Sequence, residues 1–350
     1  RVDERGEFTF RAYINGTTDL TRAEAVREII DSKTDVSRSR AAGRLAGSVY
    51  NAIDDIKKRI IDTLASLEVE IEYPEDEETI ADSFDSAALR NAEAQLAVLA
   101  ASWKSEKVYQ DGARVVLCGR TNAGKSSLFN ALLKEDRAIV SDIAGTTRDW
   151  IESWVSFDGI PVRLFDTAGL RETADFVEMR GVERTRDLSG DADVLLYLVD
   201  ASVGITDDDK AFLSDAAAVG KTAPLVLVWN KADKAPAPHA LCATGAVAEV
   251  SVSAKHGTGI AELCAVVKKV LTAGEESTRT QTGLGSERQR TAVAEALERI
   301  RHALSLTNDY ALDAVVQDIE DALDALGSVT GEVTPDDVLG AVFANFCVGK

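Results

Sequence analysis

The stretch GRTNAGKSS at 119–127 has the residue types and spacing of a phosphate-binding loop. It fits GxxxxGK[ST] in full, and it lies between a strand-like run, RVVLC, and a helix-like run, SSLFNALLK. Backbone N–H groups of such a loop, together with the start of the following helix, bind phosphate oxygens. The spacing assigns Lys125 to the β- and γ-phosphates and Ser126 to Mg²⁺. The predicted phosphate contacts are Asn122, Ala123, Gly124, Lys125, Ser126 and Ser127.

Two further motifs complete the phosphate and metal side of such a site. DTAG at 166–169 ends an apolar run, which places Asp166 on the water shell of the metal and the Gly169 N–H on the γ-phosphate. GTTRD at 145–149 offers Thr147 as a switch hydroxyl that closes over Mg²⁺. We therefore expect Mg²⁺ to be held through Ser126, Thr147 and Asp166.

The base is indicated by NKAD at 230–233, which also follows a strand-like run. A carboxylate at Asp233 can accept hydrogen bonds from N1–H and the exocyclic amine of guanine, a donor pair that adenine lacks. SAK at 253–255 is expected to complete the base pocket through backbone N–H groups. The predicted base-pocket residues are Asn230, Lys231, Asp233, Ser253, Ala254 and Lys255. Five motifs in this order predict a GTP-binding domain.

The residue that orients the attacking water is not evident from these motifs. Many regulatory GTPases place a glutamine directly after DxxG, but here that position is Leu170, whose apolar side chain cannot hold water. The acidic residues that follow it are Glu172, Asp175 and Glu178. Another group must therefore hold the attacking water, with these acids as the nearest candidates, or hydrolysis is slow.

The elements that position these motifs form an α/β block from Ala113 to about Ala273. Its short apolar runs alternate with helical stretches, which predicts a buried, mostly parallel sheet with right-handed crossovers. FDGIPV resembles a hairpin turn at Asp158-Gly159, so one antiparallel edge strand is expected.

Helix is predicted on both sides of this block. Thr21 reads as an N-cap with Glu24 three residues later. A helix-spaced apolar seam begins at Leu45, runs to Ile71 and is broken at Pro74. Helix resumes from Ser286 after a Gly/Ser/Thr-rich linker, and Thr334-Pro335 is expected to open the last helix. Because the seam needs partner helices, we expect one bundle into which the α/β domain is inserted.

Composition limits the remaining possibilities. The 350 residues carry a net charge of −20, so nonspecific coating of nucleic acid is excluded. No apolar run is long enough to span a membrane, and scattered cysteines favour a cytoplasmic setting. RVDERGEFTF shows no signal peptide and no initiator methionine, so the sequence is expected to begin inside a longer protein. One basic stripe is conceivable, although such a stripe is more often a solvated face; it comprises Arg288, Arg290, Arg299 and Arg301.

The motifs together resemble one family along the whole chain. GRTNAGKSSLFNALL, AIVSDIAGTTRD, DTAGLRETAD and the terminal FCVGK are similar to the tRNA modification GTPases called MnmE or TrmE, and so are GEFTFRAYINGTTDLTRAEAV and TGEVTPDDVLG. The resemblance implies a remnant of a folate-binding domain at 1–18 and helical parts at 19–110 and 274–350. It implies a Ras-like G domain at 111–273, inserted between the two helical parts.

The resemblance also implies an activity and its partners. It implies a homodimer that acts with a flavin-dependent partner, MnmG (GidA), to add an aminomethyl-type group to carbon 5 of the wobble uridine of tRNA. A methylene- or formyl-tetrahydrofolate is implied to supply the carbon in the full-length protein. The implied catalytic residues are Glu178, which orients water, and Cys347. The resemblance further implies a K⁺ ion that replaces an arginine finger. Its implied contacts are Asn122, Ser141, Ile143 and Thr146.

Two alternatives stay open at this point. A ribosome-assembly GTPase shares the G domain, but it needs an RNA-binding module such as a KH fold, and the helical flanks show none. A nucleotide-switched interaction scaffold needs only the bundle surface and leaves Cys347 without a chemical role.

Overall fold

The computed structural model describes residues 4–72, 86–134, 151–166, 192–218, 223–236, 245–274, 283–306, 312–332, 336–344 and 346. The chain forms two compact units. Unit 1 comprises Arg1–Ser32, Arg38–Lys107 and Thr278–Lys350, and unit 2 comprises Lys33–Ser37 and Val108–Ser277. The short segment Lys33–Ser37 belongs to unit 2 although it precedes the rest of that unit in the sequence.

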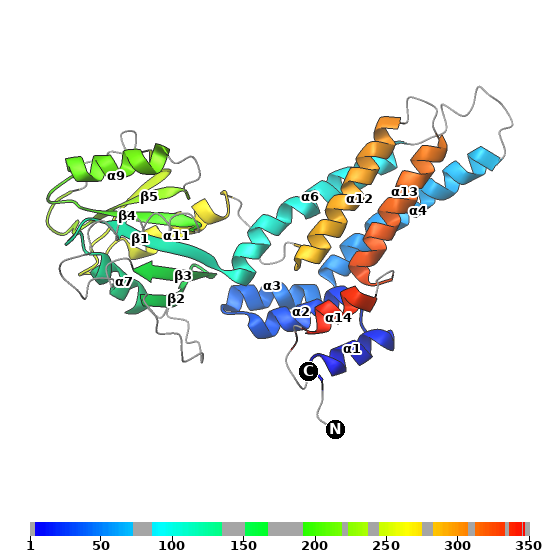
Figure 1. The fold of residues 1–350 in the computed structure, drawn as a ribbon, viewed down its shortest axis with the longest axis horizontal. Helices are drawn as coiled ribbons and strands as arrows, with labels where there is room; N and C mark the ends of the chain where they lie inside the picture. The colour runs from blue at the N-terminus through cyan, green and yellow to red at the C-terminus, as the bar shows by residue number, and fades with distance from the viewer. Residues whose placement is uncertain are drawn as a thin grey trace. The chain divides into compact units, whose positions relative to one another are not determined.

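Unit 2 is the α/β part of the chain (Figure 1). Its elements are β1 (Ala113–Gly119), α7 (Lys125–Lys134), β2 (Ile151–Phe157), β3 (Ile160–Asp166), β4 (Val194–Asp200), α9 (Asp207–Ala218), β5 (Leu225–Asn230), β6 (Ala248–Ser251) and α11 (Ile260–Leu271). The described strands form a six-stranded sheet in the order β2-β3-β1-β4-β5-β6. All neighbouring strands pair in parallel except β2 and β3. The predicted mixed sheet with one antiparallel edge strand is confirmed.

The hairpin between β2 and β3 turns at the two residues predicted from the sequence. Asp158 has φ 49° and Gly159 has φ 91°, so both lie in the left-handed region that two-residue hairpin turns with matching twist require. Phe157 pairs with Ile160 directly across this turn.

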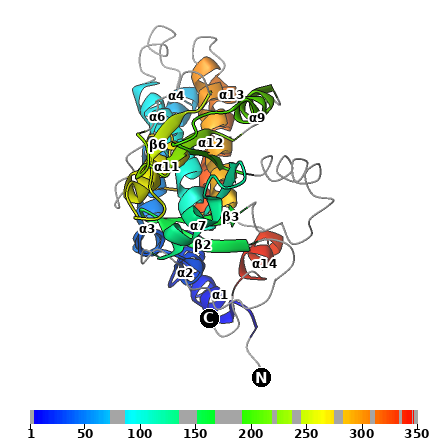
Figure 2. The same cartoon turned by 90° about the vertical axis from the view of Figure 1, so that its left-hand side faces the viewer.

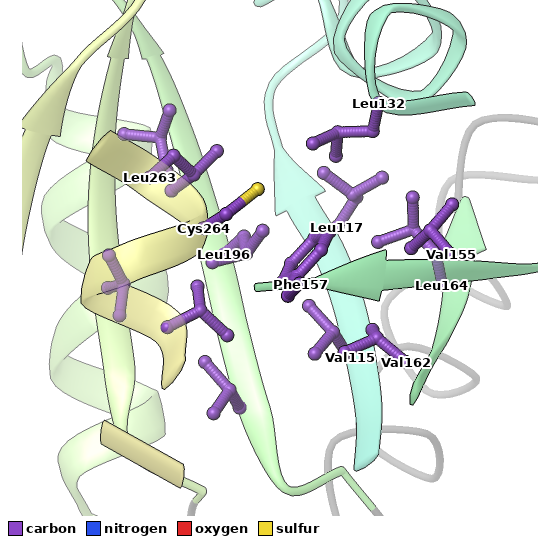
Figure 3. Close-up of a cluster of buried hydrophobic side chains, with 14 of the residues drawn as sticks. Val115, Leu117, Leu132, Val155, Phe157, Val162, Leu164, Leu196, Leu263 and Cys264 are labelled. Atoms are coloured by element: carbon purple, nitrogen blue, oxygen red, sulfur yellow. The ribbon is translucent and has the colours of Figure 1, made fainter. Parts of the chain in front are cut away.

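Both faces of the sheet are buried, which explains the near-continuous apolar strands. On one face, Leu117 and Phe157 from the strands pack with Leu132 of α7 and with Leu263 and Cys264 of α11 (Figure 3). On the other face, a second cluster from the strands meets Leu213 of α9. Helix α9 accordingly lies across the sheet from α11 (Figure 2). Layers of this kind are expected for a parallel sheet covered by crossover helices.

Unit 1 is helical (Figure 1). Its elements are α1 (Glu7–Ile14), α2 (Leu20–Asp31), α3 (Asp35–Leu45), α4 (Ser48–Glu72), α6 (Ser86–Asp111), α12 (Glu287–Leu306), α13 (Leu312–Thr330) and α14 (Asp336–Ala344). Helices α3 and α6 each contain a boundary between the units, at Arg38 and at Lys107.

One apolar core joins helices from before and after the inserted unit. It includes Val49 and Ile53 of α4, Leu96 of α6, Val293 of α12 and Ile319 of α13, all fully buried. The expectation that the seam needs C-terminal partner helices is confirmed. The seam does not start at Leu45, however, because that residue ends α3 and is 37% exposed. The left-handed Gly47 (φ 98°) separates α3 from α4.

The cap of α2 also differs from the prediction. Asp19, not Thr21, is the N-cap, and its carboxylate accepts a hydrogen bond from the Arg22 N–H at 3.0 Å. The Thr21 hydroxyl is buried and donates to the same carboxylate. Both side chains can cap a helix, and the extended backbone at Asp19 (φ −94°, ψ 172°) decides between them.

Helices α1, α2 and α14 gather at one end of unit 1 (Figures 1 and 2). Phe343 of α14 packs edge-on against Phe10 of α1, with ring centroids 5.1 Å apart, and also contacts Phe346. The Tyr13 hydroxyl donates to the carbonyl of Gly331 at 2.5 Å. The end of the chain is thereby packed as far as Phe346, whereas Thr334-Pro335 and Cys347 lie outside the described residues.

An ionic cluster is buried between α2, α3 and α6 of unit 1. Glu106 accepts hydrogen bonds from Arg40 and, at 2.8 Å, from Arg44. Arg44 also donates to Glu28 at 2.6 Å. The side chains of Arg40, Arg44 and Glu106 are only 2–3% exposed. Buried charges of this kind require mutual pairing to offset the loss of hydration.

Two glycines on the segment that leads into α12 lie against this cluster. A Cβ atom on Gly285 would stand 2.2 Å from Oε1 of Glu28, and one on Gly283 would stand 2.3 Å from Cγ of Glu106. No side chain fits at either position without moving the carboxylates. The segment that re-enters unit 1 therefore packs directly on the ionic cluster.

The arginines of α12 do not form a free basic stripe. Arg288 turns inward and binds Glu24 at 2.9 Å and the carbonyl of Val329 at 3.0 Å. The other three pair with acidic side chains: Arg290 with Glu287, Arg299 with Asp318 and Asp321, and Arg301 with Glu93. Among the described residues, no helix is long and apolar enough to cross a membrane.

Candidate nucleotide-binding site

The predicted site residues lie where four strands end at the same edge of the sheet in unit 2. Strands β1, β3, β4 and β5 are parallel, and they end at Gly119, Asp166, Asp200 and Asn230 respectively. The strand pairing sets Leu117 beside Asp166, and Asp200 beside Asn230. Ligands of open α/β sheets bind outside this carboxyl edge.

The phosphate loop joins β1 to α7. Helix α7 begins at Lys125, so its first N–H groups and its positive end face the loop. The Lys125 ammonium donates to the carbonyls of Gly119 at 2.7 Å and Arg120 at 2.9 Å. Ser126 and Ser127, in the first helical turn, are exposed. The loop thus presents backbone donors, a lysine and accessible hydroxyls within one short segment.

Close packing explains the two glycines of this loop. A Cβ on Gly119 would lie 2.4 Å from the carbonyl oxygen of Leu198 on β4. A Cβ on Gly124 would lie 2.1 Å from Nδ2 of Asn230. Both residues also have positive φ, at 130° and 98°. The loop can therefore approach the neighbouring strand and the base loop only with glycine at these positions.

Two side chains of NKAD connect the phosphate loop to the base loop. The buried Asn230 donates to the Ala123 carbonyl at 2.8 Å and accepts from the Ala254 N–H at 3.1 Å. The Lys231 ammonium donates to the carbonyl of Asn122 at 2.8 Å. Asn122 and Lys231 both have left-handed backbones, with φ 64° and 62°. The structure thus brings together three segments that the sequence predicted separately.

The carboxylate of Asp233 is held in place by the SAK segment. Its Oδ1 accepts a hydrogen bond from the buried Ser253 hydroxyl at 2.6 Å, and His256 Nε2 lies 3.9 Å from Oδ2. The Ser253 hydrogen bond lowers the pKa of the Asp233 carboxyl, so this group is ionised at neutral pH. An ionised, fixed acceptor suits the two N–H donors on one edge of guanine.

The remaining predicted residues divide into two groups. Asp166 is 4% exposed at the end of β3, and Lys255 is exposed next to Ala254. The others lie outside the described residues: Ser141, Ile143, Thr146, Thr147, Gly169, Glu178 and Cys347.

The sequence motifs did not identify Asp200 as part of this site. It is the last residue of β4, in the run VLLYLVD, and its carboxylate accepts from the Lys231 ammonium at 2.6 Å. Its position in the sequence could have identified it, because an aspartate at the end of a buried parallel strand lies at the edge of the sheet where ligands bind.

The chain is similar to known proteins along its whole length. The family described as "MnmE helical domain" matches residues 20–347. The "tRNA modification GTPase MnmE" of Treponema denticola is 47% identical over 364 residues, which cover 100% of this chain and 76% of that protein. The protein of the same name from Aquifex aeolicus is 39% identical and covers 100% and 77%.

Solved structures are similar to this chain more distantly. Era of Aquifex aeolicus, in a single-substitution variant bound to GDP.AlF4-, is 26% identical, with a TM-score of 0.37 over 53% of this chain and 66% of that chain. The G domain of FeoB from Methanococcus jannaschii is 21% identical, with a TM-score of 0.34 over 45% and 97%.

Proposed function

Because this chain belongs to the MnmE family of tRNA modification GTPases, we propose that it hydrolyses GTP in support of a modification at the wobble uridine of tRNA. The family relation makes it a GTP-hydrolysing enzyme. We propose in addition which reaction this hydrolysis serves, which ions assist it and which partners take part.

One observation gives the main support for a nucleotide-binding site in unit 2. Asn230 and Lys231 bind the carbonyls of Ala123 and Asn122, so the predicted phosphate loop and the predicted base loop are one connected structure. A nucleotide that fills both ends must carry phosphates and a base with the donor pattern of guanine. The ionised Asp233, fixed by Ser253, supports this choice of base.

The residues present suit GTP and Mg²⁺. Lys125 and the N–H groups at the start of α7 would hold the phosphates, and the exposed hydroxyl of Ser126 and the carboxylate of Asp166 would hold Mg²⁺. Bound Mg²⁺ neutralises charge that develops on the phosphate oxygens. Hard oxygen ligands of this kind match the preference of that ion.

We further propose that K⁺ acts beside the phosphates. Asn122 lies exposed at the turn of the loop, a position from which its side chain can contribute oxygen to an ion. Ser141, Ile143 and Thr146 are the proposed further contacts, and Glu178 is proposed to orient the attacking water. A cation at this place stabilises the charge that develops between the β- and γ-phosphates.

The proposed partners follow from the family. They are a second copy of this chain, the flavin-dependent protein MnmG, and tRNA, in the cytoplasm. Folate is proposed for the longer protein, and Cys347 is proposed to take part in the modification step. Phe346, the residue before Cys347 in the sequence, packs in one apolar cluster with Phe343 of α14 and Leu20 of α2.

GTP turnover in K⁺ and in Na⁺ tests this proposal. We expect turnover to rise at least tenfold when K⁺ replaces Na⁺ at equal ionic strength, and Asn122→Ala to abolish that difference. Equal rates in the two salts would overturn the role of K⁺ while leaving the GTPase intact. No turnover in either salt would overturn the assignment of the site.

A further inference from the structure

Asp200 stands at the end of β4, next to the phosphate loop and the base loop but in neither motif. Its strand partner in register is Asn230, and the N–H of the following residue, Ala201, donates to the Asn230 carbonyl at 2.8 Å. The backbone of Asp200 is thus fixed against the start of the base loop.

The carboxylate of Asp200 is held in one orientation. Its Oδ1 accepts hydrogen bonds from the Ser202 N–H at 3.0 Å and from the Ser202 hydroxyl at 2.6 Å. Its Oδ2 accepts from the Lys231 ammonium at 2.6 Å. Desolvation acts to raise the pKa of this carboxyl, but the hydrogen bonds from Lys231 and Ser202 outweigh it and lower the pKa. Asp200 is therefore a fixed anion at neutral pH.

Lys231 depends on this anion for its position. A lysine side chain loses much rotamer freedom when its ammonium is held at one place, and a single backbone carbonyl is a weak partner for it. Here the ammonium is held between Oδ2 of Asp200 and the carbonyl of Asn122. The side chains of the pair are 28% and 16% exposed, so the attraction is only partly screened by solvent.

We propose that Asp200 is a positioning residue for guanine-nucleotide binding, which acts by holding Lys231 across the phosphate loop at Asn122. This inference rests on the proposed nucleotide site and extends it to a residue outside every motif. The connection joins two loops and does not touch the transferred phosphate. Loss of this connection should therefore weaken the binding of GTP and of GDP to the same extent. It should raise KM and leave kcat nearly unchanged.

The test is nucleotide binding by the full chain with Asp200→Asn, measured with fluorescent GDP and GTP analogues by stopped flow. We expect Kd to rise about tenfold for both nucleotides, mainly through faster dissociation. Ser202→Ala, which keeps the ion pair but frees the carboxylate to rotate, should raise Kd about two- to fivefold. It provides a second test if Asp200→Asn does not fold.

The matched control is Asp207→Asn. Asp207 also pairs with a lysine of unit 2, Lys210, at 2.9 Å, but this pair is exposed on the surface of α9. We expect no change in nucleotide affinity from this substitution. A tenfold loss from Asp207→Asn as well would attribute the effect to net charge and overturn the proposal.

A double-mutant cycle separates positioning from a general structural effect. In a Lys231→Met background, Asp200→Asn should change Kd by less than twofold, because the residue through which it acts is gone. A full tenfold effect in that background, or no effect in the wild type, would overturn the role of Asp200. If the wild type itself binds no guanine nucleotide, the nucleotide site fails first and independently.

Discussion

Two groups of ion pairs in this molecule have similar donor–acceptor distances but differ in burial and in role. In the ionic cluster of unit 1, Arg44 binds Glu106 and Glu28 at 2.8 and 2.6 Å. In unit 2, Lys231 binds Asp200 at 2.6 Å. The cluster joins helices and is almost completely buried, whereas the pair in unit 2 joins loops at the ends of strands and is partly exposed to solvent.

This difference shows what distinguishes a binding site from internal support. The charges of the cluster are directed at each other, and no room is left beside Glu28 and Glu106 even for a methyl group on Gly285 or Gly283. The loops of unit 2 instead leave the carboxylate of Asp233 and the hydroxyl of Ser126 accessible. Ion-pair distance alone does not identify a site; the exposure of the polar groups does.

The largest effect is expected from Glu106→Gln. This change removes the carboxylate that two buried arginines share, and the free energy of unfolding of unit 1 should fall by about 3–5 kcal/mol. Urea unfolding followed by circular dichroism, with hydrogen exchange of peptides from α6 and α12, measures it. The control is Glu93→Gln, which breaks an exposed pair with Arg301 and should cost less than about 1 kcal/mol. Similar losses from both changes would remove the distinction between buried support and surface pairing.

The pH dependence of stability should reveal Glu28. Burial, only partly offset by Arg44, raises the pKa of this carboxyl from 4.5 to about 7, so the folded state retains a proton that the unfolded state releases. The contribution of Glu28 to stability is therefore complete below about pH 4.5 and decreases as pH rises to about 7, by up to roughly 3 kcal/mol.

The difference between the wild type and Glu28→Gln isolates this group from the other acidic side chains. We expect the free energy of unfolding of the wild type to decrease relative to the variant between pH 4.5 and 7 and to run parallel to it above pH 7. A difference that grows in the opposite direction would mean that Glu28 is ionised in the folded protein and stabilised by Arg44.

The smallest effect on stability is expected in the nucleotide site. Ser253→Ala removes the hydrogen bond that fixes Asp233, and GTP affinity should fall about fivefold, equivalent to about 1 kcal/mol. The urea midpoint should change little, because Asp233 remains hydrated. Ser156→Ala, which removes a hydroxyl from the β2–β3 hairpin of the same unit, should leave affinity unchanged. A large loss of stability from Ser253→Ala, without loss of GTP affinity, would mean that Ser253 has a structural role like that of the ionic cluster.

Features contained in one short segment could be predicted from the sequence. The phosphate loop and the hairpin at Asp158 each depend on local backbone geometry that a few residues determine. The sheet was predicted from short apolar runs that alternate with helical stretches, and the shared helical core from the helix-spaced apolar seam. The α2 cap was assigned to Thr21 instead of Asp19 because both side chains can cap a helix, and only the backbone angles separate them.

Contacts between distant segments could not be predicted in this way. Arg40 meets Glu106, and Glu24 meets Arg288 more than 260 residues later, and no local pattern specifies such pairs. For the same reason, the spacing of the α12 arginines suggested an external stripe, although the side chain of Arg288 points inward to a distant partner. Asp200 was not predicted as a site residue because its partner, Lys231, follows a different strand.

The division of unit 1 around unit 2 also affects how the protein is made. Unit 2 is almost continuous, at Val108–Ser277, so it can form as soon as its own residues leave the ribosome. The apolar face of α4 must wait for α12 and α13, which are synthesised more than 200 residues later. At 5–20 residues per second this delay is roughly 10–40 seconds. During translation the exposed α4 face is thus a natural target for chaperones that bind nascent chains.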